Sequence, residues 1–73
     1  MEIQMNSMKV QRFFRGISQE ELALRVGVDQ PAISNIERDK AKETPRTIRI
    51  KKAVAEILGV PVELLFPGKG DLP

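Results

Sequence analysis

The sequence contains no cysteine, histidine, tryptophan or tyrosine. The absence of cysteine excludes a disulfide framework and thiolate metal sites. The absence of histidine excludes histidine-based triads, the usual zinc sets and the commonest general base. The remaining carboxylates and lysines show no arrangement that would form a catalytic pocket. We therefore expect a protein that is not an enzyme and that binds no cofactor and no metal.

Long apolar runs are also missing. The longest are far too short to cross a bilayer, and the chain does not open with a charged segment followed by an apolar one. These features predict a cytoplasmic protein with no membrane association. A chain of 73 residues makes at most one domain, with one small core and little volume for a deep substrate cavity.

The charge of the chain is small overall but unevenly placed. The formal net charge is +2. Residues 27–52 carry seven basic and four acidic residues, a net charge of +3, and residues 53–73 carry one basic and three acidic residues, a net charge of −2. A positive middle is typical of a surface that meets a polyanion. A solvated charged face explains the same pattern, so this feature leaves both interpretations open.

Apolar periodicity and capping residues predict an all-α fold, a compact five-helix bundle without strands. Met5, Met8 and either Phe13 or Phe14 give the first helix its apolar stripe. The expected helices are about Met5–Arg15, Ser18–Val26, Asp29–Arg38, a fourth that begins at Thr44 or near Thr47 and ends before Gly59, and a last one from Pro61 or Val62 to about Phe66.

The second and third helices have the clearest signals. Ser18 followed by Glu21 forms a capping box, and Gly27 supplies a left-handed helix end. The third helix starts almost at once, and Ile33 and Ile36 are predicted to anchor it in the core. Two short helices joined by so tight a turn must cross at a steep angle, which is typical of a helix-turn-helix. The residues left facing outward are Gln30, Ala32, Ser34, Asn35 and Arg38.

This outward face is rich in amides, and Gln and Asn side chains can hydrogen-bond adenine bidentately. At this point the chain resembles the helix-turn-helix domains of the lambdoid phage repressor and Cro type, the XRE family. The resemblance is carried by Arg12, Ser-Gln-Glu-Glu-Leu-Ala at 18–23, Val-Gly-Val at 26–28, Ile-Ser-Asn-Ile-Glu-Arg at 33–38 and Leu-Gly-Val at 58–60. It covers about five-sixths of the chain.

The resemblance implies roles for particular positions. The implied base contacts are Gln30, Pro31 and Asn35, and the implied DNA backbone contacts are Gln19, Arg38, Lys40 and Lys42. Arg12 and Glu37 match the Arg and Glu that pair structurally between the first and third helices of this family. The fourth helix needs a polar outer face in any case, so the following residues are left out of the site: Arg46, Arg49, Lys51 and Lys52.

Three positions depart from the family pattern. Asp39 stands where the family usually has Gly after the third helix, and Asp tolerates the left-handed region less well than Gly. Pro31 removes a backbone N–H at the tip of the third helix, and Pro61 replaces the usual capping Ser or Thr of the last helix. Because of Asp39 and Pro31, the resemblance does not predict which bases the third helix contacts.

These features predict a sequence-specific regulator that occupies a double-stranded DNA operator as a repressor, with residues 1–66 as the DNA-binding domain and 67–73 as a flexible tail. We expect a homodimer, in which Leu64 could face the second subunit. The alternatives are an antitoxin or restriction-system controller with a protein partner, and an interaction module of the same fold that no longer binds DNA. Single-stranded nucleic acid is disfavoured because the three phenylalanines fall at expected core positions.

Overall fold

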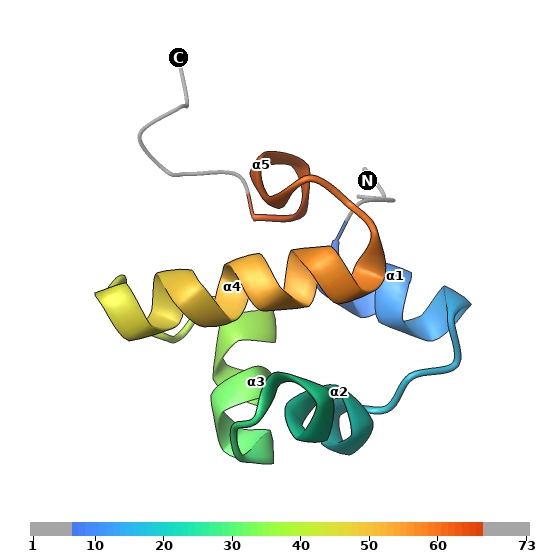
Figure 1. Ribbon diagram of the computed structural model, residues 1–73, viewed down its shortest axis with the longest axis horizontal. Helices are drawn as coiled ribbons and strands as arrows, with labels where there is room; N and C mark the ends of the chain where they lie inside the picture. Colours follow the sequence, from blue (N-terminus) through green and yellow to red (C-terminus); the bar gives the residue numbers. More distant parts are fainter. Residues whose placement is uncertain (1–6, 67–73) are drawn as a thin grey trace.

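The described part of the chain is helical throughout. The structure is a computed structural model and describes residues 7–66, which Figure 1 follows from blue to red. Its helices are α1 (Met8–Phe14), α2 (Gln19–Val26), α3 (Gln30–Glu37), α4 (Pro45–Leu58) and α5 (Val62–Leu65). Residues 7–66 contain no strand, so the predicted all-α, five-helix fold is confirmed. The predicted tail, 67–73, lies outside the described residues.

Helix α1 is shorter than the sequence predicts. Its N-cap is Ser7, whose Oγ accepts a hydrogen bond of 3.2 Å from the backbone N–H of Val10. Because this bond satisfies one of the free donors of the first turn, the helix begins at Met8. Met5, the start predicted from the apolar pattern, lies outside the described residues.

The predicted apolar stripe of α1 is wrong beyond Met8. Met8 is buried, whereas Phe13 and Phe14 are 84% and 66% exposed. Arg12 takes the position one turn after Met8, and its side chain reaches inward to α3. With about 3.6 residues per turn, the next two positions lie on the far side of the helix. The prediction that all three phenylalanines occupy core positions is therefore wrong. Of the three, only Phe66 packs against the core, and it is partly buried.

The turn between α2 and α3 sets the geometry of the pair. Ser18 Oγ caps α2 by accepting from the Glu21 N–H at 3.0 Å, and Ile17 and Leu22 are both buried beside it. Gly27 ends the helix with φ of 90°, a conformation that glycine adopts without steric cost. In Figure 1, α3 runs up the picture while α2 is seen nearly end-on, so the two helices cross steeply as predicted.

Helix α3 is anchored by Ile33 and Ile36, which are 0% and 5% exposed. Asp29 occupies its N-cap position, but the carboxylate makes no capping bond; Pro31 in the first turn has no N–H to donate. The prediction that Ser34 faces outward is wrong. Its side chain is buried, and the side chain of Arg38, one turn later, donates to its hydroxyl at 2.9 Å.

Helix α4 begins at the earlier of the two predicted starts. The hydroxyl of Thr44 accepts from the backbone N–H of Thr47 at 3.2 Å and so caps the helix in front of Pro45. Its inner face carries the buried residues Thr47, Ile50, Val54, Ala55 and Leu58, and the helix ends at Gly59. Helix α5 then adds Leu65 to the core, while Leu64 remains 53% exposed.

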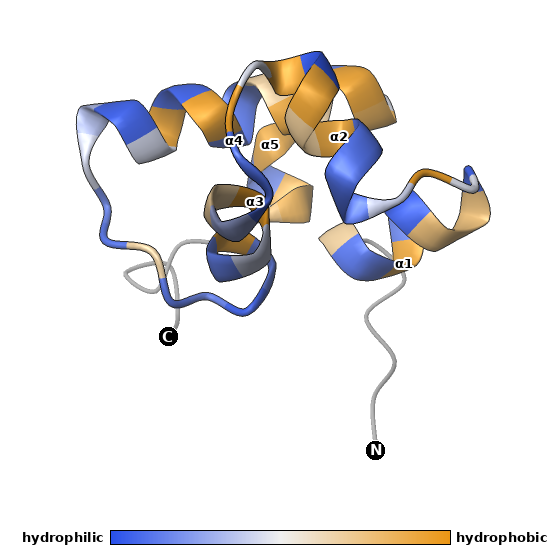
Figure 2. Ribbon diagram, turned by 90° about the horizontal axis from the view of Figure 1, so that it is seen from below, coloured by the Kyte–Doolittle hydropathy of each residue, from blue (hydrophilic) through white to orange (hydrophobic). Residues whose placement is uncertain are grey.

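The core lies where α2, α3 and α4 meet. Its fully buried side chains are Leu22, Ile33, Val54 and Leu58, and burying each stabilises the fold by about 1.5–3 kcal/mol. In Figure 2, which is coloured by hydropathy, the first turn of α4 is mostly hydrophilic and the following turns alternate between hydrophobic and hydrophilic residues. Among the described helices, none is long and apolar enough to span a bilayer. The core therefore fixes α3 against α2 and leaves its other face to solvent.

Candidate nucleic-acid interface

Arg12 and Glu37 join α1 to the end of α3 through a bidentate ion pair. Arg12 Nε donates to Glu37 Oε2 and Arg12 Nη2 to Glu37 Oε1, each at 3.0 Å. Arg12 Nη1 also donates to the carbonyl of Ile17 at 2.9 Å. The two side chains are only 16% and 8% exposed, so this pair joins the end of α3 to α1 from within the domain.

The Glu37 carboxylate stays ionised despite its burial. Burial alone would raise its pKa. The hydrogen bonds from Arg12 and then Gln19, together with the positive charges of Arg12 and Lys9, outweigh that cost and hold the pKa of Glu37 below its ordinary value. An ionised Glu37 can only accept hydrogen bonds.

Gln19 connects this buried pair to the tip of α3. Its Nε2 donates to Glu37 Oε1 at 3.0 Å, and its Oε1 accepts from Gln30 Nε2 at 3.2 Å. Because the carboxylate of Glu37 requires a donor, the amide nitrogen of Gln19 must face inward and the amide oxygen outward. The chain Arg12–Glu37–Gln19–Gln30 therefore fixes which way the exposed amide of Gln30 is turned.

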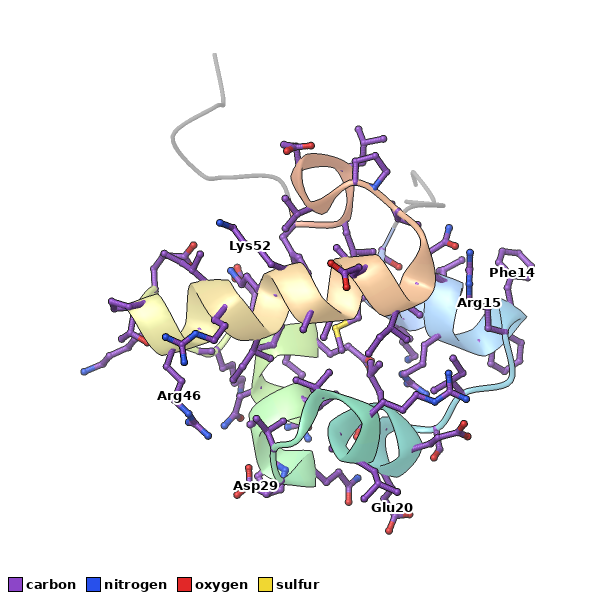
Figure 3. The ribbon with its side chains drawn as sticks, viewed as in Figure 1. Phe14, Arg15, Glu20, Asp29, Arg46 and Lys52 are labelled. Atoms are coloured by element: carbon purple, nitrogen blue, oxygen red, sulfur yellow. The ribbon has the colours of Figure 1, made fainter. Side chains whose placement is uncertain are left out.

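The starts of α2 and α3 lie at one edge of the molecule. Figure 3 shows Glu20, in the first turn of α2, and Asp29, just before α3, at the same lower edge. The residues predicted to contact bases, Gln30, Pro31 and Asn35, are all exposed on α3. Gln19, predicted to contact a phosphate, is half-buried, and its amide is engaged by Glu37 and Gln30.

The predicted backbone contacts after α3 are also exposed. Arg38, Lys40 and Lys42 all lie at the surface, and Arg38 Nη2 donates to Ser34 Oγ at 2.9 Å. Between them Asp39 has φ of 59°, in the left-handed region. This is the position where the resemblance implies glycine, and aspartate adopts the left-handed region less readily than glycine.

Sequence reasoning missed the bonds that Gln19 makes. It assigned Glu37 a single partner and treated Gln19 as a surface residue, whereas the structure links both to Gln30. Gln19 and Glu37 are 18 residues apart, and no local pattern signals a contact between them. Among the described residues, no group of three or more acidic residues could hold a metal ion.

Comparison with known proteins agrees with this geometry. The sequence model of the helix-turn-helix family matches residues 15–65, more than two thirds of the chain and all of α2, α3 and α4. Neither a curated protein nor a solved structure matches the chain. The chain therefore belongs to the Cro/C1-type helix-turn-helix family, a family of DNA-binding regulators.

Proposed function

We propose that this chain is a sequence-specific regulator that represses transcription by occupying a double-stranded DNA operator, with α3 in the major groove. The observation that carries this proposal is the exposed amide of Gln30, held in one orientation from within the domain. A pre-oriented amide on a rigid helix is suited to reading a base edge, since binding then restricts little further side-chain freedom.

The orientation of Gln30 predicts the base that it reads. One N–H of its amide is bonded to Gln19 Oε1, which leaves the other N–H and the Oε1 atom for a partner. An adenine presents the matching pair in the major groove, the N7 acceptor and the N6 donor. We therefore assign Gln30 to an adenine. Pro31 and Asn35 complete the base-reading face, where Pro31 offers an apolar contact for a thymine methyl group.

The backbone contacts set the position of α3 in the groove. Arg38, Lys40 and Lys42 extend the positive surface from the end of α3 along the following loop, where they would neutralise phosphates on one side of the groove. Gln19 lies at the start of α2, where the free backbone N–H groups of a helix favour a phosphate. These contacts carry no sequence information, so discrimination rests on α3.

We propose that the protein binds its operator as a homodimer, because so small a domain reads few base pairs alone. A single recognition helix reads few base pairs, whereas a two-fold dimer reads two half-sites about one helical turn apart. Leu64 on α5 is 53% exposed and would lie in that dimer interface. Sedimentation of the free protein and of its DNA complex tests this, because Leu64→Lys should shift both toward one copy if the residue is buried between subunits.

The experiment that tests the function is a fluorescence-anisotropy titration at two salt concentrations. It compares the DNA immediately upstream of the protein's own gene with a scrambled duplex. Preference for the upstream DNA by a factor of about 10³ or more, weakening steeply with salt, supports a self-regulating repressor. Equal, weak binding to both duplexes would indicate that the operator lies elsewhere than upstream of the gene. No binding to either at low salt contradicts DNA binding and favours an interaction module of the same fold.

Loss of the Gln30 amide should weaken operator binding without unfolding the protein. Gln30→Ala removes the base contact, and we expect affinity for the operator to fall by about 5- to 150-fold, the equivalent of about 1–3 kcal/mol. Gln30→Glu keeps the shape and removes the donors, so it should lose at least as much. The melting temperature should stay nearly constant because the side chain is exposed. An equal loss on scrambled DNA would contradict a base-reading role.

A further inference from the structure

Lys51 on α4 joins the loop that follows α3 to the end of α5. In Figure 2 this loop, residues 39–43, runs in a wide, mostly hydrophilic arc from α3 to the start of α4. Lys51 Nζ donates to Glu43 Oε1 in the loop at 2.9 Å, and it also lies 5.3 Å from the centre of the ring of Phe66, the C-cap of α5. One side chain therefore contacts both the loop and the end of α5.

Backbone hydrogen bonds hold the start of this loop but not its second half. The N–H of Lys40 donates to the carbonyl of Asn35 at 2.7 Å, so the loop leaves α3 in a fixed direction. In the described part of the chain, no backbone hydrogen bond joins residues 41–43 to a helix. Ala41 packs against the core, partly buried. The side-chain bond of Glu43 is therefore the hydrogen bond that ties the second half of the loop to the fold.

The side chain of Lys51 is itself held in place by packing. It is 15% exposed, whereas Glu43 is 63% exposed. The face of the Phe66 ring attracts the ammonium group through a cation–π interaction. Exposed ion pairs contribute little when two mobile side chains must be ordered to form them. Because Lys51 is already ordered by its surroundings, it can hold Glu43 at a smaller entropic cost.

The ion pair also determines where the negative charge of Glu43 lies. Glu43 directly follows Lys42, which is proposed to contact a phosphate. A free carboxylate at this place would repel phosphates and compete with them for the lysine. In the structure, Glu43 and Lys51 instead line one cavity together with Val62 of α5 and with Phe66. The pair therefore holds the carboxylate on the α5 side of the loop.

We propose that Lys51 is a positioning residue for DNA binding, which holds the loop after α3 through Glu43. The loop then presents Lys40 and Lys42 to the DNA backbone in a fixed arrangement. This inference rests on the proposed function, which assigns those two lysines to phosphates. Lys51 makes no contact with DNA in this role, because its ammonium group is engaged by Glu43 and Phe66. A loop that is ordered in advance loses less freedom on binding, so the affinity for duplex DNA of any sequence rises.

The first measurement concerns the loop in the free protein. NMR relaxation should give backbone order parameters of about 0.85 for residues 41–43 in the wild type, and values below about 0.6 in Lys51→Met. Methionine keeps an unbranched side chain that packs beside Phe66 but cannot donate to Glu43. The order parameters of α2 should be the same in both proteins, which shows that the variant is folded. Unchanged order in residues 41–43 would overturn the proposal.

The second measurement is binding of the same two proteins to a mixed-sequence duplex at several salt concentrations. Lys51→Met should bind about 2- to 10-fold more weakly, which corresponds to ordering about one more side chain on binding. The slope of log K against log salt should stay nearly unchanged, because the same phosphates are contacted. A direct phosphate contact by Lys51 would instead lower the slope by about 0.9. A slope lowered by that amount, or an unchanged affinity, overturns the proposal.

Three further variants separate the role of Lys51 from a general loss of charge. Lys52→Met removes the same charge from the next residue, which is exposed and forms no hydrogen bond or ion pair with residues 7–66. It should leave the order of the loop and the affinity nearly unchanged. Lys51→Arg keeps a charged donor and should restore both. When Glu43→Ala has already removed the ion pair, Lys51→Met should cause little further loss of affinity. A loss as large as in the wild type would contradict a role that acts through Glu43.

The outcomes also distinguish this inference from the proposed function. If Lys51→Met loosens the loop and weakens binding while the upstream DNA is never preferred, the role of Lys51 is confirmed and only the sequence-specific part of the function fails. If the upstream DNA is preferred and Lys51→Met binds as well as the wild type, the function stands and the role of Lys51 is wrong. A wild type that binds no duplex at low salt overturns both.

Discussion

Removing Arg12 should destabilise the domain far more than removing an exposed arginine. The variant Arg12→Ala deletes both 3.0 Å bonds to Glu37 and the 2.9 Å bond to the Ile17 carbonyl. Glu37, with 8% of its side chain exposed, would then be left as a nearly buried anion with only the amide of Gln19 as a donor. The destabilisation therefore combines broken bonds with an uncompensated charge.

The burial of the ion pair sets the expected loss of stability. Breaking one side of a buried ion pair costs about 3–5 kcal/mol. The guanidinium keeps 16% exposure and Gln19 still bonds the carboxylate, so we expect the low end, about 3 kcal/mol. At about 4–8 °C per kcal/mol for a domain of this size, the melting temperature should fall by roughly 12–24 °C. Circular dichroism during heating and during urea titration measures both quantities.

Two controls make the result decisive. Arg25 pairs with Glu21 on α2, but these side chains are 50% and 42% exposed, so Arg25→Ala should cost at most about 1 kcal/mol. The double variant Arg12→Met/Glu37→Leu replaces the pair with apolar side chains and should recover most of the lost stability, since no unpaired charge remains. If Arg12→Ala costs no more than Arg25→Ala, the pair does not hold α3 in place and this reasoning is refuted.

Two further predictions concern the fold. The pKa of Glu37 is below its unfolded value of 4.5, so its ionised form stabilises the domain at neutral pH and that stability is lost as the pH falls through the folded pKa. Urea titrations at decreasing pH should show this loss for the wild type, and Glu37→Gln should flatten it; an unchanged acid dependence would contradict the assignment. Gly27→Ala should cost about 1 kcal/mol in the same assay, because φ is 90° while the space around the new Cβ is open; a loss as large as that of a core truncation would point to a steric clash instead.

Features set by residues close in the chain were predictable from the sequence. Ser18, Gly27 and Gly59 mark helix ends through bonds and dihedral angles that involve neighbours within one turn, and each lies at the predicted boundary. The two starts proposed for α4 show the limit of this reasoning. Thr44 and Thr47 both satisfy local rules, and the hydrogen bond from Thr47 N–H to Thr44 Oγ settles the choice.

Features that depend on where other helices lie were not predictable from local patterns, and the Arg12–Glu37 pair was expected only from the resemblance to a known family. The apolar pattern of α1 favoured a phenylalanine in the core, but the neighbouring helix offers Glu37, so Arg12 turns inward and Phe13 and Phe14 stay in solvent. Ser34 is buried although the apolar pattern of α3 places it on the outward face, and Arg38 donates to its hydroxyl.

The same distinction between local features and contacts between helices applies to the candidate site. The sequence alone predicted the helix-turn-helix and, apart from Ser34, which side of the third helix is buried, since capping and periodicity act over a few residues. Only the tertiary structure decided that Glu37 orients Gln19 and that Gln19 orients Gln30, a relay between residues far apart in the chain. It also decided that the start of α4 extends past α2 and α3, with Arg46 on the α3 side of the helix. Contacts of this kind depend on how the helices pack, which no short stretch of sequence encodes.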